Sequence, residues 1–309
     1  MIEIMRLPTI HLTLRRRYKI VISLFLGFGI VAVMAFVLQN AHFPVFDTAG
    51  EVANKQRDLI IFTSILSLVI ILPVFVLLFA IAWRFRASNT KARYRPNWDH
   101  SRVAETIWWG LPALLIIFLS IIIWTSSHQL DPYRPLVSTK QPITIQVVSL
   151  QWKWLFIYPD QKVASMNFMQ IPKDTPINFV ITADSPMNSF WIPQLGGQVY
   201  AMNGMTTKLH LMADRDGDFR GSSANLSGDG FSGMTFVARA GSEKEFTDWV
   251  DRQQTAKPLD WTTYTELAKP SKDQPRTEYR LKDTDLYDKV VEKYMPHHSS
   301  TDTMRGHGN

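Results

Sequence analysis

The sequence predicts a membrane-anchored, all-β protein with transmembrane helices in its N-terminal part. Two long apolar segments, at about 59–83 and 103–124, can each cross a bilayer, which takes roughly 20 residues of helix. From about residue 142 the pattern changes to short alternating segments separated by Pro, Gly, Asn and Asp, as in a β-sandwich or barrel. The 309 residues suffice for one membrane portion and one globular domain.

The N-terminal segment has features of both a signal sequence and a membrane anchor. The basic stretch Arg15–Lys19 precedes an apolar run from Ile20 to Leu38. A basic start before an apolar core is typical of a signal sequence, but this run is also long enough to span a bilayer. Because Gln39-Asn40-Ala41 makes a poor cleavage site, we expect an uncleaved helix, with a cleaved signal as the alternative.

The two further spans have the composition of membrane helices. Each contains one proline, Pro73 or Pro112, which membrane helices tolerate because neighbouring groups satisfy the freed carbonyl. Tryptophans lie near the span ends, where an amphipathic ring prefers the headgroup layer. These tryptophans are Trp83, Trp108, Trp109 and Trp124.

Charge determines the expected orientation in the membrane. The loop between the two spans is rich in Lys and Arg and contains one acidic residue, Asp99. Because basic loops stay in the cytoplasm, the N-terminus is expected inside and the chain after Trp124 in the periplasm of a bacterium. The net charge of +6 resides in the membrane portion, whereas residues 128–309 are nearly neutral. A nucleic-acid-binding face is therefore excluded.

The domain after the spans is expected to be built from short strands, followed by helices. Alternating apolar residues predict strands at about 143–148, 152–158, 163–168, 177–181, 189–192, 208–212 and 234–238. After Ser242 the apolar spacing becomes helical, and the polar tail is expected to be disordered. The expected organisation is a signal or anchor span in 1–45, a helical hairpin in 46–127, a periplasmic β-domain in 128–242, a helical extension in 243–296 and a tail in 297–309.

One short segment carries most of the functional information. Residues 223–234 read Ser-Ala-Asn-Leu-Ser-Gly-Asp-Gly-Phe-Ser-Gly-Met. Their spacing resembles the binuclear copper site in subunit II of the haem-copper respiratory oxidases, where the pattern is Cys-x3-Cys-x3-His-x2-Met with a further His upstream. Bridging thiolates, imidazoles and a thioether suit soft copper.

Only the methionine of that ligand set is present. The degenerate copper-site positions are Asn188, Ser223, Asn225, Ser227, Phe231 and Met234. The chain has no cysteine, so it can form no thiolate site and has no lipid-modified cysteine near residue 40, where relatives often carry one. We expect these positions to bind no metal. Asn188 and Ser227 are expected to keep the local turns through side-chain-to-backbone hydrogen bonds.

With these metal ligands absent, the chain resembles subunit II of the quinol-oxidising branch of this family, closest to the cytochrome bo-type, over roughly residues 47–295. The resemblance implies a cupredoxin-like Greek-key barrel and a place as subunit II of a proton-pumping ubiquinol oxidase that reduces oxygen to water. It implies subunit I as the principal partner, subunits III and IV as further partners, and a bacterial inner membrane. Haems and copper are expected in subunit I, and no cofactor or catalytic residue in this chain. Ubiquinol and menaquinol both fit these residues.

Glu105 is the single candidate for a role in proton transfer. It stands at the cytoplasmic start of the third span, and with Trp109 and Pro112 it resembles the family pattern whose Glu lies at the entrance of the proton channel of subunit I. The simpler explanation is that an acidic side chain favours the first turn of a helix, where the macrodipole is positive.

Other notable residues have simpler explanations than chemistry. Segment 151–158 resembles the aromatic stretch that carries electrons to copper; without copper, we expect its rings to pack the barrel against subunit I. His210 has no expected partner, and His297, His298 and His307 form an incidental tail cluster. Methionine is a common core filler, so copper capture is not expected at Met187, Met202, Met205, Met212 or Met234.

Two alternative functions differ in what they require. An electron-carrying cytochrome c oxidase subunit would need thiolates, and the chain has none. A membrane-tethered cupredoxin-like assembly or binding protein acting alone would need neither Glu105 nor the pattern from Trp109 to Pro112. Association with a haem-containing partner would separate the second alternative from a subunit of an oxidase.

Overall fold

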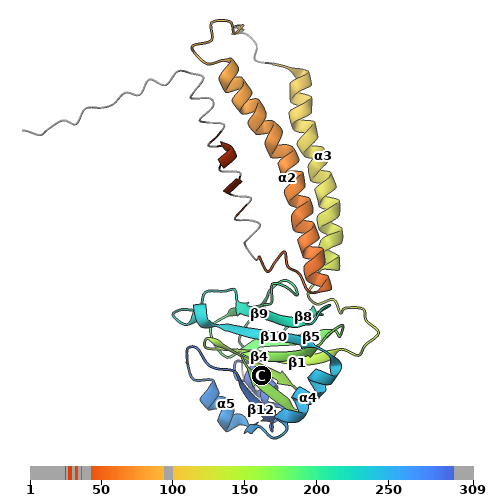
Figure 1. The fold of residues 1–309 in the computed structure, drawn as a ribbon, viewed down its shortest axis with the longest axis vertical. Coiled ribbons are helices and arrows are strands. Elements are labelled where there is room, and N and C mark those ends of the chain that lie inside the picture. Colours follow the sequence, from red (N-terminus) through yellow and green to blue (C-terminus); the bar gives the residue numbers. More distant parts are fainter. Residues whose placement is uncertain are drawn as a thin grey trace, which may run out of the picture. The chain divides into compact units, whose positions relative to one another are not determined.

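The computed structural model describes residues 43–93 and 100–295, together with residues 25, 27–29, 32–33 and 36 (Figure 1). The expected first span at 20–38 lies largely outside these residues. So do part of the basic loop, at 94–99, and the tail from 297 with its three histidines.

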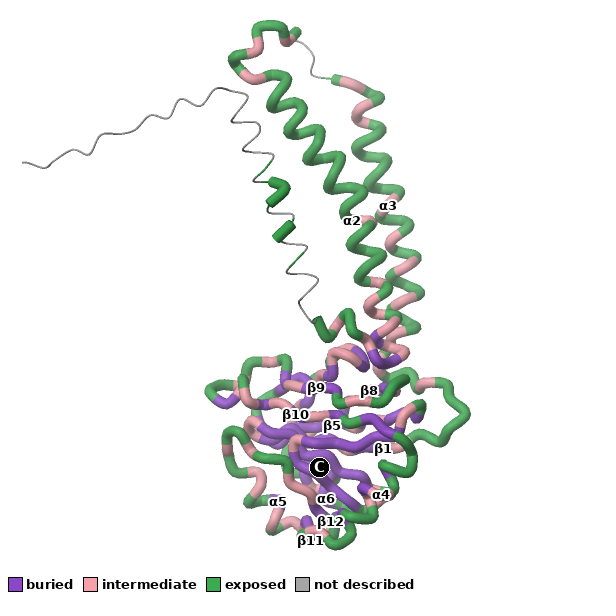
Figure 2. Tube along the Cα trace, viewed as in Figure 1, coloured by how far each residue is buried: buried purple, intermediate pink, exposed green. Residues whose placement is uncertain are grey.

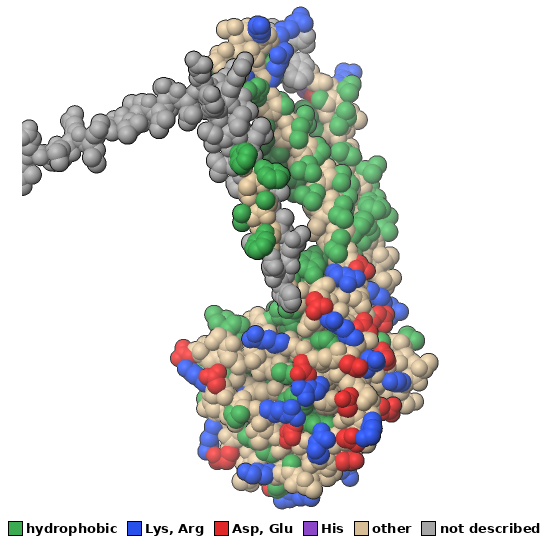
Figure 3. All heavy atoms as spheres, viewed as in Figure 1, with side chains coloured by type: hydrophobic (Ala, Val, Ile, Leu, Met, Phe, Trp, Pro, Cys, Tyr) green, Lys and Arg blue, Asp and Glu red, His purple; other side chains and the backbone are tan. Residues whose placement is uncertain are grey.

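Two long helices form the membrane portion. Helix α2 spans Glu51–Arg84 and helix α3 spans Arg102–Gln129, and both are long and apolar enough to cross a membrane. Pro73 and Pro112 lie inside them, as expected. The hairpin residues are mostly exposed (Figure 2), and their side chains are largely apolar, whereas charged side chains of both signs are scattered over the visible face of the β-domain (Figure 3). A surface of this kind is stable only in lipid or against other apolar helices, so the chain is membrane-anchored.

The β-domain consists of two sheets, which confirms the prediction of a sandwich or barrel. The seven-stranded sheet has the order β11-β12-β3-β2-β1-β5-β8, and the five-stranded sheet has the order β4-β10-β9-β6-β7. The first contains β1 (Ile143–Leu150), β2 (Lys153–Tyr158), β3 (Val163–Met166), β5 (Ile177–Ala183), β8 (Thr207–Leu211), β11 (Lys257–Leu259) and β12 (Thr277–Leu281). The second contains β4 (Phe168–Pro172), β6 (Asn188–Trp191), β7 (Val199–Ala201), β9 (Gly217–Ser223) and β10 (Thr235–Gly241).

Aromatic rings fill the space between the two sheets. Trp154 and Phe156 of β2 lie 5.4 and 6.2 Å from the ring of Phe190, and Phe190 stacks on Phe236 at 5.2 Å. Trp154 and Phe156 are fully buried within the domain. The expectation that the rings of 151–158 pack the barrel against subunit I is therefore wrong for these side chains, because a ring that already fills the core has no area left for a partner.

The expected strand at 163–168 is two strands, because the chain turns at Asn167. Asn167 has a positive φ of 54°, which Asn tolerates better than most residues. Its Oδ1 accepts a hydrogen bond from the backbone N–H of Trp154 at 2.8 Å. The turn moves the chain from the seven-stranded sheet, where β3 pairs with β2, to the five-stranded sheet, where β4 pairs with β10.

The C-terminal extension contains helices, but it also contributes strands that were not expected. Helix α4 (Glu243–Gln253) begins with a capping box between Ser242 and Glu245, as the change of pattern after Ser242 indicated. Helices α5 (Trp261–Leu267) and α6 (Leu286–Glu292) follow. The helices of the predicted extension are present, but the segment also contains β11 and β12, which lengthen the seven-stranded sheet through the pairing of β12 with β3.

Backbone contacts connect the start of α2 to the β-domain. The N–H groups of Ala49 and Ala53 donate to the carbonyls of Gln194 and Leu195, at 2.7 and 3.2 Å. A Cβ at Gly50 would lie 2.5 Å from the carbonyl oxygen of Met212, so this close approach requires glycine. His210, expected to have no partner, in fact donates from Nδ1 to the carbonyl of Pro132 at 2.9 Å. The segment after α3 is thereby attached to β8.

Candidate functional site

The degenerate copper-site positions come together where the start of β6 meets the segment after β9. The hydroxyl of Ser223 donates to Oδ1 of Asn188 at 2.6 Å, and both side chains are buried. Asn225 donates from Nδ2 to the carbonyl of Met187 at 3.0 Å. Asn188 and Ser223, two positions where the resemblance places metal ligands, thus bond directly to each other, and this hydrogen bond holds the start of β6 beside the end of β9.

Asn188 and Ser227 do not play the same part, although both were expected to keep turns. Asn188 donates from Nδ2 to the carbonyl of Pro186 at 2.8 Å, which confirms the expectation for this residue. The hydroxyl of Ser227 is buried and has no hydrogen-bond partner among the described residues, so the expectation is wrong for Ser227. Its carbonyl, not its side chain, is the anchored group, because it accepts from Nε1 of Trp152 at 2.9 Å.

Trp152 is the residue that sequence reasoning missed at this site. It sits between β1 and β2 with a positive φ of 63°, a conformation that is unfavourable for a bulky residue. Its indole packs against Gly230, where a Cβ would come within 2.4 Å of the ring. Gly230 therefore leaves room for the indole, which holds the 223–234 segment through this contact and the hydrogen bond to the Ser227 carbonyl. No sequence signal marks the backbone conformation of Trp152.

The remaining two positions belong to the short helix η1 (Phe231–Gly233) and to the core. Met234 is fully buried, and its carbonyl accepts from the N–H of Ser223 at 3.1 Å. Phe231 is partly buried at the start of η1. The site thus offers hydroxyls, amides and one thioether, a donor set that does not fit a binuclear copper centre. Within the described residues, no three His, Cys, Asp or Glu side chains are grouped as metal ligands.

Glu105 lies in the first turns of α3 and interacts with the segment before the helix. Its Oε1 accepts from the backbone N–H of Ser101 at 3.2 Å and lies 3.0 Å from Nδ1 of His100. The hydroxyl of Ser101 in turn accepts from the N–H of Ala104 at 3.4 Å and caps the helix. The Glu105 side chain is 37% exposed and that of His100 83% exposed. The geometry serves helix capping, and it also forms a water-accessible carboxylate–imidazole pair.

A second buried constellation, around Asp184, was not anticipated from the sequence. The side chain of Asp184, just after β5, is 2% exposed and accepts hydrogen bonds from Tyr264 and Lys293, both at 2.7 Å, and from the hydroxyl of Tyr294. Burial lowers the pKa of Lys293, but the hydrogen bond and charge of Asp184 outweigh burial, so the pKa is raised. We call these four residues the Asp184 cluster. It fastens the C-terminal extension to the loop that leads to Asn188.

Comparison with known proteins gives two family matches. Residues 162–241 match the model of the cytochrome c oxidase subunit II periplasmic domain, and residues 253–298 match the COX aromatic rich motif. The first match agrees with a cupredoxin-like domain made of the two sheets. The second covers the C-terminal extension, which supplies Tyr264 and Tyr294 to the Asp184 cluster.

Whole-chain relatives are more specific. The chain is 48% identical to cytochrome bo(3) ubiquinol oxidase subunit 2 of Pseudomonas aeruginosa, over 88% of this chain and 82% of the relative. It is 43% identical to ubiquinol oxidase subunit 2 of Acetobacter aceti, over 84% and 85% of the two chains. It is 38% identical to quinol oxidase subunit 2 of Bacillus cereus, over 73% and 78%. With this identity over most of its length, the chain belongs to the ubiquinol oxidase subunit 2 family of the haem-copper oxidases.

Proposed function

We propose that this chain is the second subunit of a proton-pumping ubiquinol oxidase in a bacterial inner membrane, and that it acts there as a scaffold and in proton uptake. Its relatives carry the name of subunit 2 of ubiquinol or quinol oxidases. The catalytic work of such a complex is the oxidation of quinol and the reduction of oxygen to water. In this proposal that work, with its haems and copper, belongs to subunit I.

One observation carries the proposal that the chain transfers no electrons. The two loops that would bind copper are held by the hydrogen bond between Ser223 and Asn188 and by the indole of Trp152. A redox centre needs ligands that stabilise two oxidation states, and hydroxyls and amides do not do this for copper. In this proposal the two loops have a structural role: their conformation helps to position the β-domain on subunit I.

The proposed arrangement follows from the charge pattern. The basic loop after α2 lies in the cytoplasm, and the β-domain lies in the periplasm. The proposed division is a signal or anchor span in 1–45, the hairpin in 46–127, the β-domain in 128–242, the extension in 243–296 and the tail in 297–309. The hairpin packs on subunit I, and subunits III and IV complete the complex.

Glu105 would serve proton uptake from the cytoplasm. Its carboxylate lies within hydrogen-bonding distance of the His100 imidazole, and both side chains reach water. A proton accepted by either group can pass to the other across 3.0 Å. A carboxylate at the mouth of a channel can accept protons from water and release them inwards, and an amide cannot.

The test compares Glu105→Gln and Glu105→Asp in the purified oxidase, with oxygen consumption measured per haem and subunit content checked. An obligatory proton-transfer group is typically worth about 100-fold or more, and an entrance group with water beside it should matter roughly several-fold. We expect turnover to fall in Glu105→Gln and to recover in part in Glu105→Asp. Glu266→Gln, an exposed acid in α5, is the matched control and should leave turnover unchanged.

A purely structural role of Glu105 predicts a different result. Losing a helix N-terminal charge costs about 0.3–1 kcal/mol, with unchanged turnover in every variant. Separately, co-purification of this chain with a haem-containing partner, followed by a difference spectrum and quinone analysis, tests the assignment to a quinol oxidase. A chain that purifies without a haem protein would refute that assignment.

A further inference from the structure

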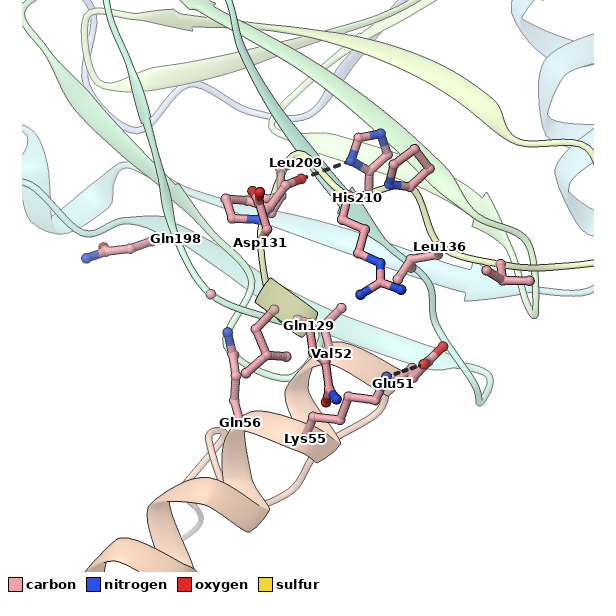
Figure 4. Close-up of a pocket in the computed structure, with 16 residues that line it drawn as sticks. Glu51, Val52, Lys55, Gln56, Gln129, Asp131, Leu136, Gln198, Leu209 and His210 are labelled. Atoms are coloured by element: carbon pink, nitrogen blue, oxygen red, sulfur yellow. Dashed lines mark hydrogen bonds and ion pairs between the residues drawn. The ribbon is translucent and has the colours of Figure 1, made fainter. Parts of the chain in front are cut away.

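A cavity of about 460 Å³ lies between the membrane helices and the β-domain. Three parts of the chain line it: the first turns of α2, the segment after α3, and β8 with the loop before β7. Figure 4 shows Glu51 and Lys55 on one wall and Asp131 and His210 on another. No role proposed above uses this cavity.

The cavity lies at the depth of the lipid headgroups. The apolar part of α2 begins at Leu59, and the residues of α2 that line the cavity lie at 51–56. At 1.5 Å per residue they stand roughly 5–12 Å beyond the hydrocarbon layer. On α3, Trp124 marks the interface, and the lining begins at Gln129.

An apolar groove continues from the cavity between α2 and α3. The groove has a volume of about 700 Å³ and shares residues 130–132 with the cavity. Its lining residues lie between Leu59 and Ile70 on α2 and from Leu119 to Ser127 on α3. Eleven helical residues rise about 16 Å, which is close to half of the roughly 30 Å hydrocarbon core. The groove therefore runs through one leaflet.

The cavity contains charges of both signs, and two of the charged side chains form no ion pair with any described residue. Lys55 and Glu51 pair at 2.6 Å. Among the described residues, the Arg134 side chain makes one hydrogen bond, from Nη1 to the carbonyl of His128 at 3.4 Å. The Asp131 carboxylate accepts one, from the backbone N–H of Tyr133 at 2.9 Å, and the backbones of the two residues are joined by the Arg134 N–H and the Asp131 carbonyl at 3.0 Å. Neither Arg134 nor Asp131 forms an ion pair with any residue that the structure describes. A guanidinium and a carboxylate thus remain available to a ligand.

We propose that this cavity and groove bind one phospholipid of the outer leaflet whose headgroup carries both a phosphate and an ammonium. Arg134 binds the phosphate, because a guanidinium matches its geometry. Asp131 attracts the ammonium, and one acyl chain lies in the groove. A quinol has an apolar tail too, but its head is uncharged and offers neither Arg134 nor Asp131 an ionic partner.

The experiment uses the whole oxidase complex in nanodiscs of phosphatidylethanolamine that contain a trace of the same lipid with a photoreactive group on its acyl chain. After illumination, peptide mass spectrometry locates and counts the lipid adducts. We expect adducts concentrated on the groove-lining parts of α2 and α3, at 59–70 and 119–130. Arg134→Glu should reduce them by roughly tenfold, since a charge-assisted hydrogen bond is worth about 1.5–3 kcal/mol.

Two controls separate this site from ordinary lipid contact. Arg252→Glu makes the same charge change at an exposed position of α4 and should leave the adducts unchanged. Ser67→Phe fills the groove without touching the charges and should also reduce the adducts. The proposal is overturned if adducts spread evenly over α2 and α3, which would indicate boundary lipid only. It is also overturned if Arg134→Glu has no effect, or if a photoreactive quinone labels the groove and the phospholipid does not.

Discussion

Replacing Asp184 by alanine tests whether the Asp184 cluster holds the C-terminal extension on the β-domain. The carboxylate accepts from Tyr264 of α5 and from Lys293 and Tyr294 beyond α6, and these residues lie about 80 to 110 positions away along the chain. The substitution removes a common acceptor for three donors. It should loosen the extension while leaving the two aromatic-filled sheets in place.

The expected loss of unfolding free energy depends on how exposed each of the three donors is. Tyr264 is 1% exposed, so its hydroxyl would lose its partner without gaining water, at a cost of about 1–3 kcal/mol. The Lys293 side chain is 46% exposed and Tyr294 is 41% exposed, so water replaces part of what those bonds contribute, and each adds about 0–1 kcal/mol. We expect a total loss of about 3 kcal/mol.

The assay is thermal and urea unfolding of the fragment 128–309, with limited proteolysis of the extension. For a domain of this size, a loss of about 3 kcal/mol lowers Tm by roughly 6–12 °C. Asp216→Ala is the control, because Asp216 is exposed and its nearest cation, Lys173, is 3.8 Å away. Its effect should stay within about 0.5 kcal/mol.

The pH dependence gives an independent check. Because the pKa of Lys293 is raised in the folded chain, its contribution is fully present below its unfolded pKa of 10.5 and is lost as pH rises further. The difference in unfolding free energy between the wild type and Asp184→Ala should therefore become smaller above that pH. A loss no larger than that of Asp216→Ala, or an extension that resists proteolysis equally in both proteins, would refute the reasoning.

Three further predictions concern the cap of α5, the copper frame and the first span. Hydrogen bonds from the Thr263 backbone N–H, then from its hydroxyl and from Lys282, lower the pKa of Asp260 to about 2. The free energy of unfolding should therefore fall as pH drops from 3.8 towards 2. In Asp260→Asn, the urea midpoint should lack this dependence on pH. The fragment 128–309 should hold well under one copper per chain by metal analysis, and tight stoichiometric copper would contradict this. A purple copper spectrum should follow from Asn188→His, Ser223→Cys, Asn225→Glu, Ser227→Cys and Phe231→His. Intact mass of the purified subunit should retain residues 20–38, whereas a terminus near residue 40 would indicate a cleaved signal.

The sequence by itself determined the class of the protein, because the relevant signals are local. Long apolar runs with interfacial tryptophans mark spans whatever surrounds them. Alternation marked strands such as β1, and the change to helical apolar spacing after Ser242 marked the start of α4. The frame in 223–234 could be read because its ligand positions have fixed spacing, and the complete lack of cysteine removed the copper interpretation.

Signals were weakest where partners that are distant in sequence decide the local structure. Strand β9 reads Gly-Asp-Phe-Arg-Gly-Ser-Ser and has little strand propensity of its own. It forms because it pairs with β10 on one side and β6 on the other. Strands β11 and β12 are fixed in the same way, by the pairing of β12 with β3.

Tertiary structure alone decided how the metal-free site is held. The bond between Ser223 and Asn188 joins residues 35 positions apart, and that between Trp152 and Ser227 joins residues 75 positions apart. The Asp184 cluster and the contact of His210 with Pro132 depend on similarly distant partners. Residue identity gives the hydrogen-bonding capacity of a side chain, but only the packing of the sheets and helices determines which groups come within 3 Å of each other.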